Sequence, residues 1–476
     1  MTRVVIVGGG PGGYEAALVA AQLGADVCVV DRDGLGGSAV LTDCVPSKTL
    51  VATAEVITQV RESGQLGLRI GRASPEVSGV TVDVAKVNAR VKALVRAQSG
   101  DVDRQLQREG IRVLRGTGRL DGPDRVIASL DDGGTELLDA DVILVSTGAH
   151  PRVLPDAVPD GRRILTWEQV YDLDELPERL IVVGSGVTGA EFAGAYNALG
   201  CDVVLVSSRD RVLPSEDADA ATVIEDVFTR RGMTVLSRSR AASVQRGPVD
   251  GGRDGVVVTL TDGRVVEGSH CLLAVGSVPN TADMGLEKAG VRLDDAGFVD
   301  VDRVSRTTAR GVYAAGDCTG VLMLASVAAM QGRIAMRHAL GDAVQPLDLE
   351  QVSATVFTDP EIATIGWSQA DVDSGQVQAV SVKLPLARNA RAKMQGIHDG
   401  FVKLFCRPGT GIIVGGVVVA PRASELIHPV SMAVSGRMTV DQVANAFAVY
   451  PSLSGSVAEA ARRLHLRDAA PGSGHE

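Results

Sequence analysis

Two glycine-rich segments have the spacing of a turn that binds a dinucleotide. The first contains Gly8, Gly10, Gly12 and Gly13, and the second contains Gly184, Gly186 and Gly189. Glycines in this arrangement let backbone N–H groups approach a pyrophosphate at the N-terminus of a helix. A single motif of this kind also occurs as a plain glycine turn in other α/β proteins. Two of them in one chain predict two dinucleotide sites.

The residues around each glycine-rich segment predict the same strand–helix–strand unit. Before the first segment, Val4–Val7 is a continuous apolar run that is typical of a buried parallel strand. A helical stretch over Tyr14–Leu23 and a second strand over Asp26–Val30 follow. The pattern recurs later in the chain, with strands over Leu180–Val183 and Asp202–Val206 on either side of a helix. The chain therefore contains an internal repeat of two nucleotide-binding units.

The second strand of each unit ends in residues of different charge. In the first unit Asp31 ends the strand, where a carboxylate binds ribose hydroxyls, which suits the adenosine half of FAD. In the second unit the strand is followed by Ser207, Ser208, Arg209 and Arg211, with no carboxylate placed to bind a 2′-hydroxyl. Hydroxyl and guanidinium groups accommodate a 2′-phosphate. The alternative is a solvated turn with incidental arginines, and we expect NADPH, NADH or both as the second nucleotide.

Composition excludes several classes of partner. The 47 basic and 58 acidic residues give a net charge of −11, so nucleic acid and anionic membranes are poor partners. No apolar run approaches the roughly 18–20 residues that span a bilayer, and the chain begins in a strand without a signal peptide. The six cysteines show no close pairing, which predicts a reducing cytoplasm, and the seven histidines show no metal-ligand spacing.

The segment from Gly36 to Lys48, GGSAVLTDCVPSK, resembles the redox-active segment of the flavoprotein disulfide reductases, the family of dihydrolipoamide dehydrogenase and glutathione reductase. The family pattern there is GGTCxxxGCxPSK. Cys44 matches the second cysteine of the pattern, but Ala39 stands in place of the first. A disulfide needs two sulfurs and a dithiol relay begins with attack by a thiolate, so alanine supports neither.

Further motifs extend the resemblance over essentially the whole chain. They begin at Thr147 (TGAHP), Gly276 (GSVPNT), Tyr313 (YAAGDC) and Phe357 (FTDPEI). The resemblance implies that Thr147, Gly148 and Gly276 lie in cofactor-binding turns and that Asp317 binds the ribityl chain of FAD. In detail the chain is most similar to an actinobacterial branch of dihydrolipoamide-dehydrogenase-like proteins that act as NAD(P)H:quinone reductases.

The resemblance also assigns roles to residues beside the flavin. Lys48 and Glu191 match a pair that meets near the flavin N5, where hydride arrives, so both are expected to be catalytic and cofactor-binding. Cys44 is expected to be a redox remnant, with an inert buried thiol as the alternative. Val187 replaces a tyrosine that acts as a lid over the nicotinamide face in glutathione reductase.

The chain lacks the first redox cysteine, the histidine base and the glutamate that a dithiol mechanism needs. The family's HPTxSE motif supplies a histidine base and a glutamate from the partner subunit, whereas this chain has Tyr450-Pro451-Ser452-Leu453-Ser454-Gly455. Tyrosine, with an ordinary pKa of about 10, is a poor base near neutrality. The resemblance therefore implies an FAD-dependent NAD(P)H:quinone oxidoreductase that passes electrons directly from flavin to a quinone. The alternatives are a soluble pyridine nucleotide transhydrogenase and a non-catalytic flavoprotein sensor or scaffold.

The expected fold is α/β. Two Rossmann-like parallel-sheet domains, for FAD and for NAD(P), are followed by an α+β C-terminal dimerisation domain that makes the protein a homodimer. Alternating segments over Phe401–Phe405 and Ile412–Val419 predict antiparallel strands in that last domain. The expected boundaries are 1–150 and 276–346 for the two parts of the FAD domain, 151–275 for the NAD(P) domain, 347–466 for the dimerisation domain and 467–476 for a disordered tail.

Overall fold

The first glycine-rich segment connects a buried strand to a helix, as the sequence predicts. A computed structural model, which describes residues 1–68, 81–249 and 251–468, places β1 (Arg3–Val7) inside a seven-stranded sheet. Val4 and Ile6 of β1 pack in one apolar cluster, and Val5 and Val7 pack in another. Both faces of the sheet are therefore covered, which explains the continuous apolar run.

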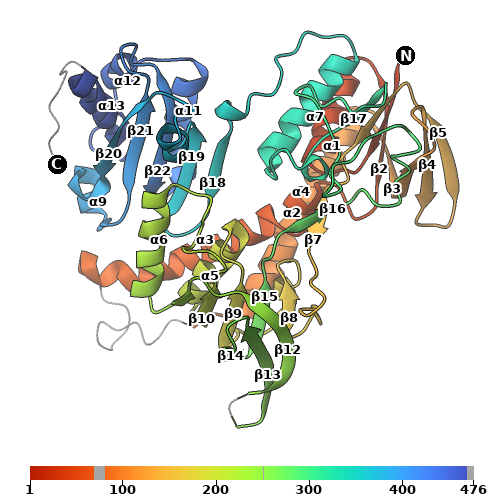
Figure 1. The fold of residues 1–476 in the computed structure, drawn as a ribbon. Coiled ribbons are helices and arrows are strands. Elements are labelled where there is room, and N and C mark those ends of the chain that lie inside the picture. The colour runs from red at the N-terminus through yellow and green to blue at the C-terminus, as the bar shows by residue number, and fades with distance from the viewer. Residues whose placement is uncertain (69–80, 250, 469–476) are drawn as a thin grey trace.

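The first sheet is assembled from distant parts of the chain (Figure 1). β1 is parallel to its neighbours β2 and β6, and β17 joins at the far edge of β6. β3, β4 and β5 extend the other side as an antiparallel meander. The strands of this sheet after β1 are β2 (Asp26–Asp31), β3 (Arg112–Leu120), β4 (Arg125–Leu130), β5 (Thr135–Asp139), β6 (Val142–Val145) and β17 (Val312–Ala314).

Two helices of this region approach each other unusually closely. α1 (Pro11–Gln22) connects β1 to β2, and α7 (Ala325–Ala339) packs against it. A Cβ atom on Gly332 would lie 2.1 Å from the carbonyl oxygen of Gly12. Glycine at both positions allows this contact, which ties the N-terminal residues to a helix more than three hundred residues later in the chain.

The second nucleotide unit forms a separate parallel sheet. Its five strands are ordered β11-β10-β9-β15-β8, and α5 connects β9 to β10. A three-stranded antiparallel sheet, β12-β13-β14, packs at its side. The elements are β8 (Ile164–Thr166), β9 (Arg179–Val183), α5 (Val187–Leu199), β10 (Asp202–Val206), α6 (Ala218–Arg230), β11 (Thr234–Leu236), β12 (Ala241–Val249), β13 (Arg253–Leu260), β14 (Val265–Gly268) and β15 (His270–Leu273).

The C-terminal region is a five-stranded antiparallel sheet with helices. The strands are ordered β18-β19-β22-β21-β20. Its elements are β18 (Ser353–Val356), β19 (Glu361–Gly366), α8 (Gln369–Asp373), β20 (Val380–Pro385), α9 (Ala390–Met394), β21 (Phe401–Cys406), β22 (Ile413–Ala420), α10 (Ala423–Leu426), α11 (His428–Ser435), α12 (Val440–Asn445) and α13 (Gly455–Asp468). This arrangement confirms the predicted fold class.

The central strands of this last sheet are buried on both faces. Every residue of β21 and of β22 is buried. Phe401 and Phe405 pack in a cluster with residues of the second nucleotide unit, and Val402 and Leu404 pack under the C-terminal helices. The C-terminal helices therefore cover one face of these strands, and another region of the same chain covers the other.

Two long helices connect the regions. α3 (Cys44–Glu62) begins beside the first sheet and packs against α5 of the second, and α4 (Val84–Arg108) packs against α3. The remaining regular elements are short: α2 (Gly37–Leu41), β7 (Ala149–Pro151), β16 (Ser277–Pro279) and 3-10 turns, of which η2 (Val170–Asp172) and η3 (Asp317–Thr319) concern the site. The boundaries at 150, 275 and 346 remain a prediction. α13 runs through Asp468, and residues 469–476 of the expected tail lie outside the described residues.

Candidate active site

The first glycine-rich segment lines a cavity of about 580 Å³. Its walls also contain Asp31, the turn at Thr147 and Gly148, and Asp317. The structure thus brings together, from four separate stretches of chain, most of the residues that the sequence predicts to bind FAD. Gly13, Lys48 and Gly276 do not line this cavity.

The glycines of this cavity are required by close backbone contacts. A Cβ atom on Gly8 would lie 2.2 Å from the carbonyl oxygen of Ser146, and one on Gly13 would lie 1.9 Å from that of Gly8. Gly8 also has a φ of 102°, a conformation that favours glycine. The same constraint recurs in the second unit, where a Cβ on Gly189 would lie 1.8 Å from the carbonyl oxygen of Gly184. Both turns therefore present bare backbone at a helix N-terminus, which fits a dinucleotide pyrophosphate.

Asp31 is buried at the end of β2, with 6% of its surface exposed. Its two carboxylate oxygens accept hydrogen bonds from the backbone N–H groups of Gly9 (2.8 Å) and Gly34 (2.6 Å). A carboxylate has about four lone-pair sites, so capacity for a ribose hydroxyl remains. Asp31 therefore shapes the glycine-rich turn as well as lining the cavity.

The two predicted cofactor-binding turns are fastened to each other. The Thr147 hydroxyl donates to the carbonyl oxygen of Asn280 (2.7 Å), and the Asn280 side chain donates to the carbonyl oxygen of Thr147 (2.9 Å). β7 and β16 pair antiparallel beside these bonds, close to Gly148 and Gly276. A two-stranded ribbon thus joins the first sheet to the second near the cavity.

Lys48 and Glu191 form a partly buried ion pair. The Lys48 Nζ lies 2.7 Å from Oε2 of Glu191, and only 4% of the Glu191 side chain is exposed. The other oxygen, Oε1, accepts the backbone N–H of Phe357 (2.8 Å), and Nζ lies 4.8 Å from the centre of the Phe357 ring. Three regions of the chain meet at this carboxylate.

Burial and pairing act in opposite directions on this ion pair. Burial raises the pKa of Glu191, and Lys48 offsets part of that rise. Burial is the largest single effect on Lys48 and lowers its pKa. The charge and hydrogen bond of Glu191, with the charges of Cys44 and Asp43, together outweigh burial, so the Lys48 pKa is raised overall. The ammonium therefore keeps its proton at neutral pH and stays a fixed positive charge at the site.

Ala39 and Cys44 both line the cavity, on α2 and at the start of α3. All six cysteines are free thiols. A helix N-terminus normally favours a thiolate. Here burial, followed by the charge of Asp43, raises the pKa of Cys44 to about 11, so its sulfur is a neutral thiol near neutrality.

Asp43 is a site residue that the sequence analysis missed. It stands where the family pattern has glycine, directly before Cys44, and lines the same cavity. Aspartate is a preferred N-cap residue, yet at the start of α3 its side chain makes no capping hydrogen bond. Burial raises the pKa of Asp43, and burial together with Asp43 raises the pKa of Asp317 to about 6. The departure from glycine was the signal that could have identified it.

In the second unit, residues 207–217 connect β10 to α6 and are called the nucleotide loop here. Its first residue, Ser207, is completely buried. The Ser185 hydroxyl donates to the Ser207 hydroxyl (2.7 Å), and the one proton of Ser207 lies within reach of the carbonyl oxygens of Arg209 (3.2 Å) and Arg211 (3.3 Å). Ser207 therefore shapes the loop from inside, whereas Ser208 is exposed.

The two predicted arginines differ in their surroundings. Arg209 is exposed, and its side chain has no ion-pair partner within the described residues. Arg211 is half-buried and its guanidinium donates to the carbonyl oxygens of Pro214 and Glu216. A third arginine, Arg238, donates its backbone N–H to the Arg209 carbonyl oxygen and exposes 82% of its side chain. The sequence analysis did not identify Arg238 because it follows β11, well separated in sequence from Arg209 and Arg211.

Of the two residues expected near a partner subunit, Tyr450 is on the surface and Gly455 is half-buried. Tyr450 is 85% exposed and does not line the cavity of its own chain. Gly455 begins α13, and its backbone N–H donates to the Ser452 hydroxyl (3.1 Å). Val187 begins α5 and is 42% exposed. Neither Tyr450 nor Gly455 has the chemistry of the base and orienting acid in the family motif.

Two family models match the chain. The model for pyridine nucleotide-disulphide oxidoreductases matches residues 2–332, and the model for the dimerisation domain of the same enzymes matches residues 352–461. The chain belongs to the pyridine nucleotide-disulphide oxidoreductase family. The family uses FAD and a pyridine nucleotide, so both cofactor predictions are confirmed, and the dimerisation domain supports the predicted homodimer.

Individual members of the family are similar along nearly their whole length. An NAD(P)H dehydrogenase (quinone) from Mycobacterium tuberculosis is 55% identical, over 98% of this chain and 95% of the relative. A dihydrolipoyl dehydrogenase from Chlamydia pneumoniae is 31% identical, over 96% and 95%. The crystal structure of LpdA from Mycobacterium tuberculosis superposes with a TM-score of 0.91, at 55% identity, over 98% of this chain and all of that one. The flavoprotein disulfide reductase RclA from Escherichia coli, 22% identical with a TM-score of 0.83, shares the fold.

The described ranges hold neither a cluster of metal ligands nor a membrane-spanning helix. They contain no group of three or more histidine, cysteine, aspartate or glutamate side chains placed to hold a metal ion. Within the same ranges, no helix is both long and apolar enough to cross a bilayer.

The raised pKa of Cys44 predicts slow alkylation. Iodoacetamide at pH 7.5 should modify Cys44 roughly two orders of magnitude more slowly than a free cysteine of ordinary pKa, with a midpoint near pH 11. Asp43→Asn removes a negative charge and should lower that midpoint. Peptide mass spectrometry follows each cysteine separately, and Cys28, whose pKa is also about 11 for reasons unrelated to Asp43, is the internal control. A Cys44 midpoint at or below pH 8.5 would contradict this description.

Proposed function

We propose that the protein is an NAD(P)H:quinone oxidoreductase that does not reduce disulfides. The observation that carries the proposal is a contrast between two features at the start of α3, where Cys44 lines the cavity and Lys48 follows one turn later. The Lys48–Glu191 ion pair supports a role in reduction of the cofactor, but the only thiol from the family's redox pair is Cys44, because Ala39 supplies no sulfur. The similarity to an NAD(P)H dehydrogenase (quinone) supports the same assignment.

When bound, FAD carries two electrons between the nicotinamide and the acceptor. The chain's own residues hold the cofactor in position and supply the charged groups around it. Glu191 fixes the direction of the Lys48 side chain, and the Lys48 ammonium favours negative charge that develops beside it. The glycine-rich turns hold the two pyrophosphates, and Asp31 and Asp317 orient the sugar and ribityl hydroxyls.

Asp43 supplies a proton to the acceptor in this proposal. Reduction of a quinone to a quinol takes up two electrons and two protons, of which a hydride brings both electrons and one proton. The Asp43 carboxyl lines the cavity beside Cys44, is not used in helix capping and has a raised pKa, so it holds a proton more readily than an exposed aspartate. Water replaces that proton after each turnover.

The loop that follows β10, with Arg209 and Arg211, determines which nucleotide the proposed enzyme uses. We assign recognition of the 2′-phosphate of NADPH mainly to Arg209, with Arg211 holding the loop, while NADH binds through the same glycine-rich turn. A cytoplasmic location completes the proposal, since six free thiols suit a reducing compartment.

An acceptor panel tests the central proposal. Wild-type protein should reduce menadione and benzoquinones with NAD(P)H and leave lipoamide, glutathione disulfide and thio-NAD unreduced. Cys44→Ser should keep most of the quinone rate, because no electron passes through sulfur. Lys48→Met should lower kcat by about 10- to 100-fold, because the fixed charge is lost and Glu191 is left buried alone. Lys86→Met, at a surface lysine with 86% of its side chain exposed, is the control.

Two results would refute this mechanism. One is substantial lipoamide turnover by the wild type, and the other is loss of quinone reduction in Cys44→Ser. Rapid turnover of thio-NAD would instead favour the transhydrogenase.

The proton from Asp43 has its own signature. Asp43→Asn should lower the rate at which quinone reoxidises the reduced enzyme and should leave cofactor bleaching by NADPH nearly unchanged. Stopped-flow absorbance separates the two half-reactions. Because the pKa of Asp43 is raised, the wild-type reoxidation rate should fall as pH rises through that pKa, and this step should disappear in the variant. An unchanged pH profile would assign the proton to another donor.

Arg209→Ala tests the nucleotide assignment. Charge-assisted hydrogen bonds are worth roughly 1.5–3 kcal/mol, so the dissociation constant for NADPH should rise about tenfold or more while that for NADH stays nearly constant. Equilibrium titration of each nucleotide measures both. Equal weakening of the two nucleotides would mean that Arg209 contacts their common part.

A further inference from the structure

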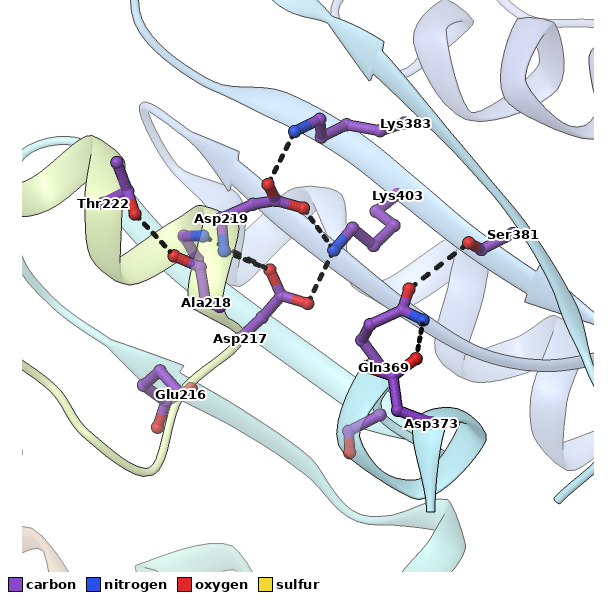
Figure 2. Close-up of polar contacts among 12 residues, drawn as sticks. Glu216, Asp217, Ala218, Asp219, Thr222, Gln369, Asp373, Ser381, Lys383 and Lys403 are labelled. Carbon is purple, nitrogen blue, oxygen red and sulfur yellow. Dashed lines mark hydrogen bonds and ion pairs between the residues drawn. The ribbon is translucent and has the colours of Figure 1, made fainter. Parts of the chain in front are cut away.

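A buried ion cluster joins the nucleotide loop to the C-terminal sheet. Lys403 on β21 lies 2.8 Å from Asp217 and 2.5 Å from Asp219, which are at the start of α6 (Figure 2). Only 5% of the Lys403 side chain and 2% of the Asp217 side chain are exposed. A buried ion pair is weak evidence for stability, because well-packed apolar residues often stabilise equally well. The location of Asp217 points to a different role.

The cluster is balanced in charge. Lys383 on β20 is directly opposite Lys403 in the strand register, where two like charges repel. Asp219 bridges them, with one oxygen 2.6 Å from Lys383 and the other 2.5 Å from Lys403. Burial opposes ionisation of Asp219, but the hydrogen bonds from the two lysines lower its pKa overall, so it stays charged at neutral pH.

Asp217 is where the nucleotide loop ends and α6 begins. One of its oxygens accepts the backbone N–H groups of Asp219 (3.0 Å) and Ala220 (3.3 Å), which caps the helix. The other oxygen contacts Lys403. A single carboxylate therefore fixes the start of α6 and fastens it to the C-terminal sheet, as Figure 2 shows.

The loop before Asp217 is connected back to the glycine-rich turn. The Arg211 guanidinium donates to the carbonyl oxygen of Glu216, and the Glu216 N–H donates to that of Leu213 (3.0 Å). The Leu213 N–H in turn donates to the carbonyl oxygen of Ser185 (2.8 Å), between the glycines of the turn. Hydrogen bonds, together with the peptide bond between Glu216 and Asp217, thus connect Lys403 to the nucleotide turn.

We propose that Lys403 is a positioning residue for discrimination between NADPH and NADH. By holding Asp217, it keeps residues 207–217 in the arrangement in which Arg211 holds the loop and Arg209 faces a 2′-phosphate. The inference rests on the proposed recognition of NADPH by this loop. Part of the nucleotide specificity then depends on Lys403, a residue of the C-terminal sheet that acts through Asp217.

The test compares 2′,5′-ADP with 5′-AMP, which differ in the 2′-phosphate. Isothermal titration calorimetry of the FAD-loaded dimer measures both dissociation constants without turnover. The double variant Asp217→Asn/Lys403→Met keeps a capping oxygen and leaves no buried charge unpaired, so its Tm should stay near that of the wild type. Its preference for 2′,5′-ADP should nevertheless fall about tenfold, as when one charge-assisted contact no longer forms well.

Two single variants complete the test. Asp217→Asn alone leaves Lys403 paired with Asp219, so it should fold and show a loss of preference in the same direction. Lys383→Met is the matched control, because it removes a lysine from the same cluster but leaves Asp217 held, and its preference should equal that of the wild type.

Each outcome decides a different point. Wild-type preference in either folded Asp217 variant, or an equal loss of preference in Lys383→Met, overturns the positioning role of Lys403. If the wild type itself binds the two nucleotides equally, the NADPH assignment fails as well, and the positioning role fails with it.

Discussion

The buried carboxylate of Glu191 is the constraint on which the arrangement of the three regions depends. A buried charge is costly unless it is paired and hydrogen-bonded. Glu191 meets that requirement only when α3 brings Lys48, α5 brings Glu191 itself, and the chain entering the C-terminal sheet brings the N–H of Phe357. Residues about 140 and 310 positions apart along the sequence are thereby locked together. A site for electron transfer gains from this, because any slippage between the regions would leave the charge without a partner.

Much of the fold could be predicted because its signals are local. Gly8 and Gly184 need conformations that favour glycine, and the apolar runs at Val4 and Leu180 mark strands covered on both faces. The burial of Lys403 could not be predicted in this way. Its partners, Asp217 and Asp219, come from another region, and only the packing of α6 against the C-terminal sheet removes that lysine from water.

The candidate site was predictable for a different reason. Lys48, Glu191 and Asp317 carry no periodic or spacing signal of their own, and the family resemblance identified them. Asp43 and Arg238 were missed because each departs from that pattern or lies outside it. Such residues emerge only when the structure places them, Asp43 in the cavity wall and Arg238 beside the loop of Arg209.

The solitary neutral thiol at Cys44 determines how this site responds to oxidants. Peroxides and related oxidants react with thiolates, and a low-pKa thiol beside a second one passes through a sulfenic acid to a disulfide. Cys44 has neither a low pKa nor a neighbouring sulfur at position 39, and this site therefore resists that chemistry.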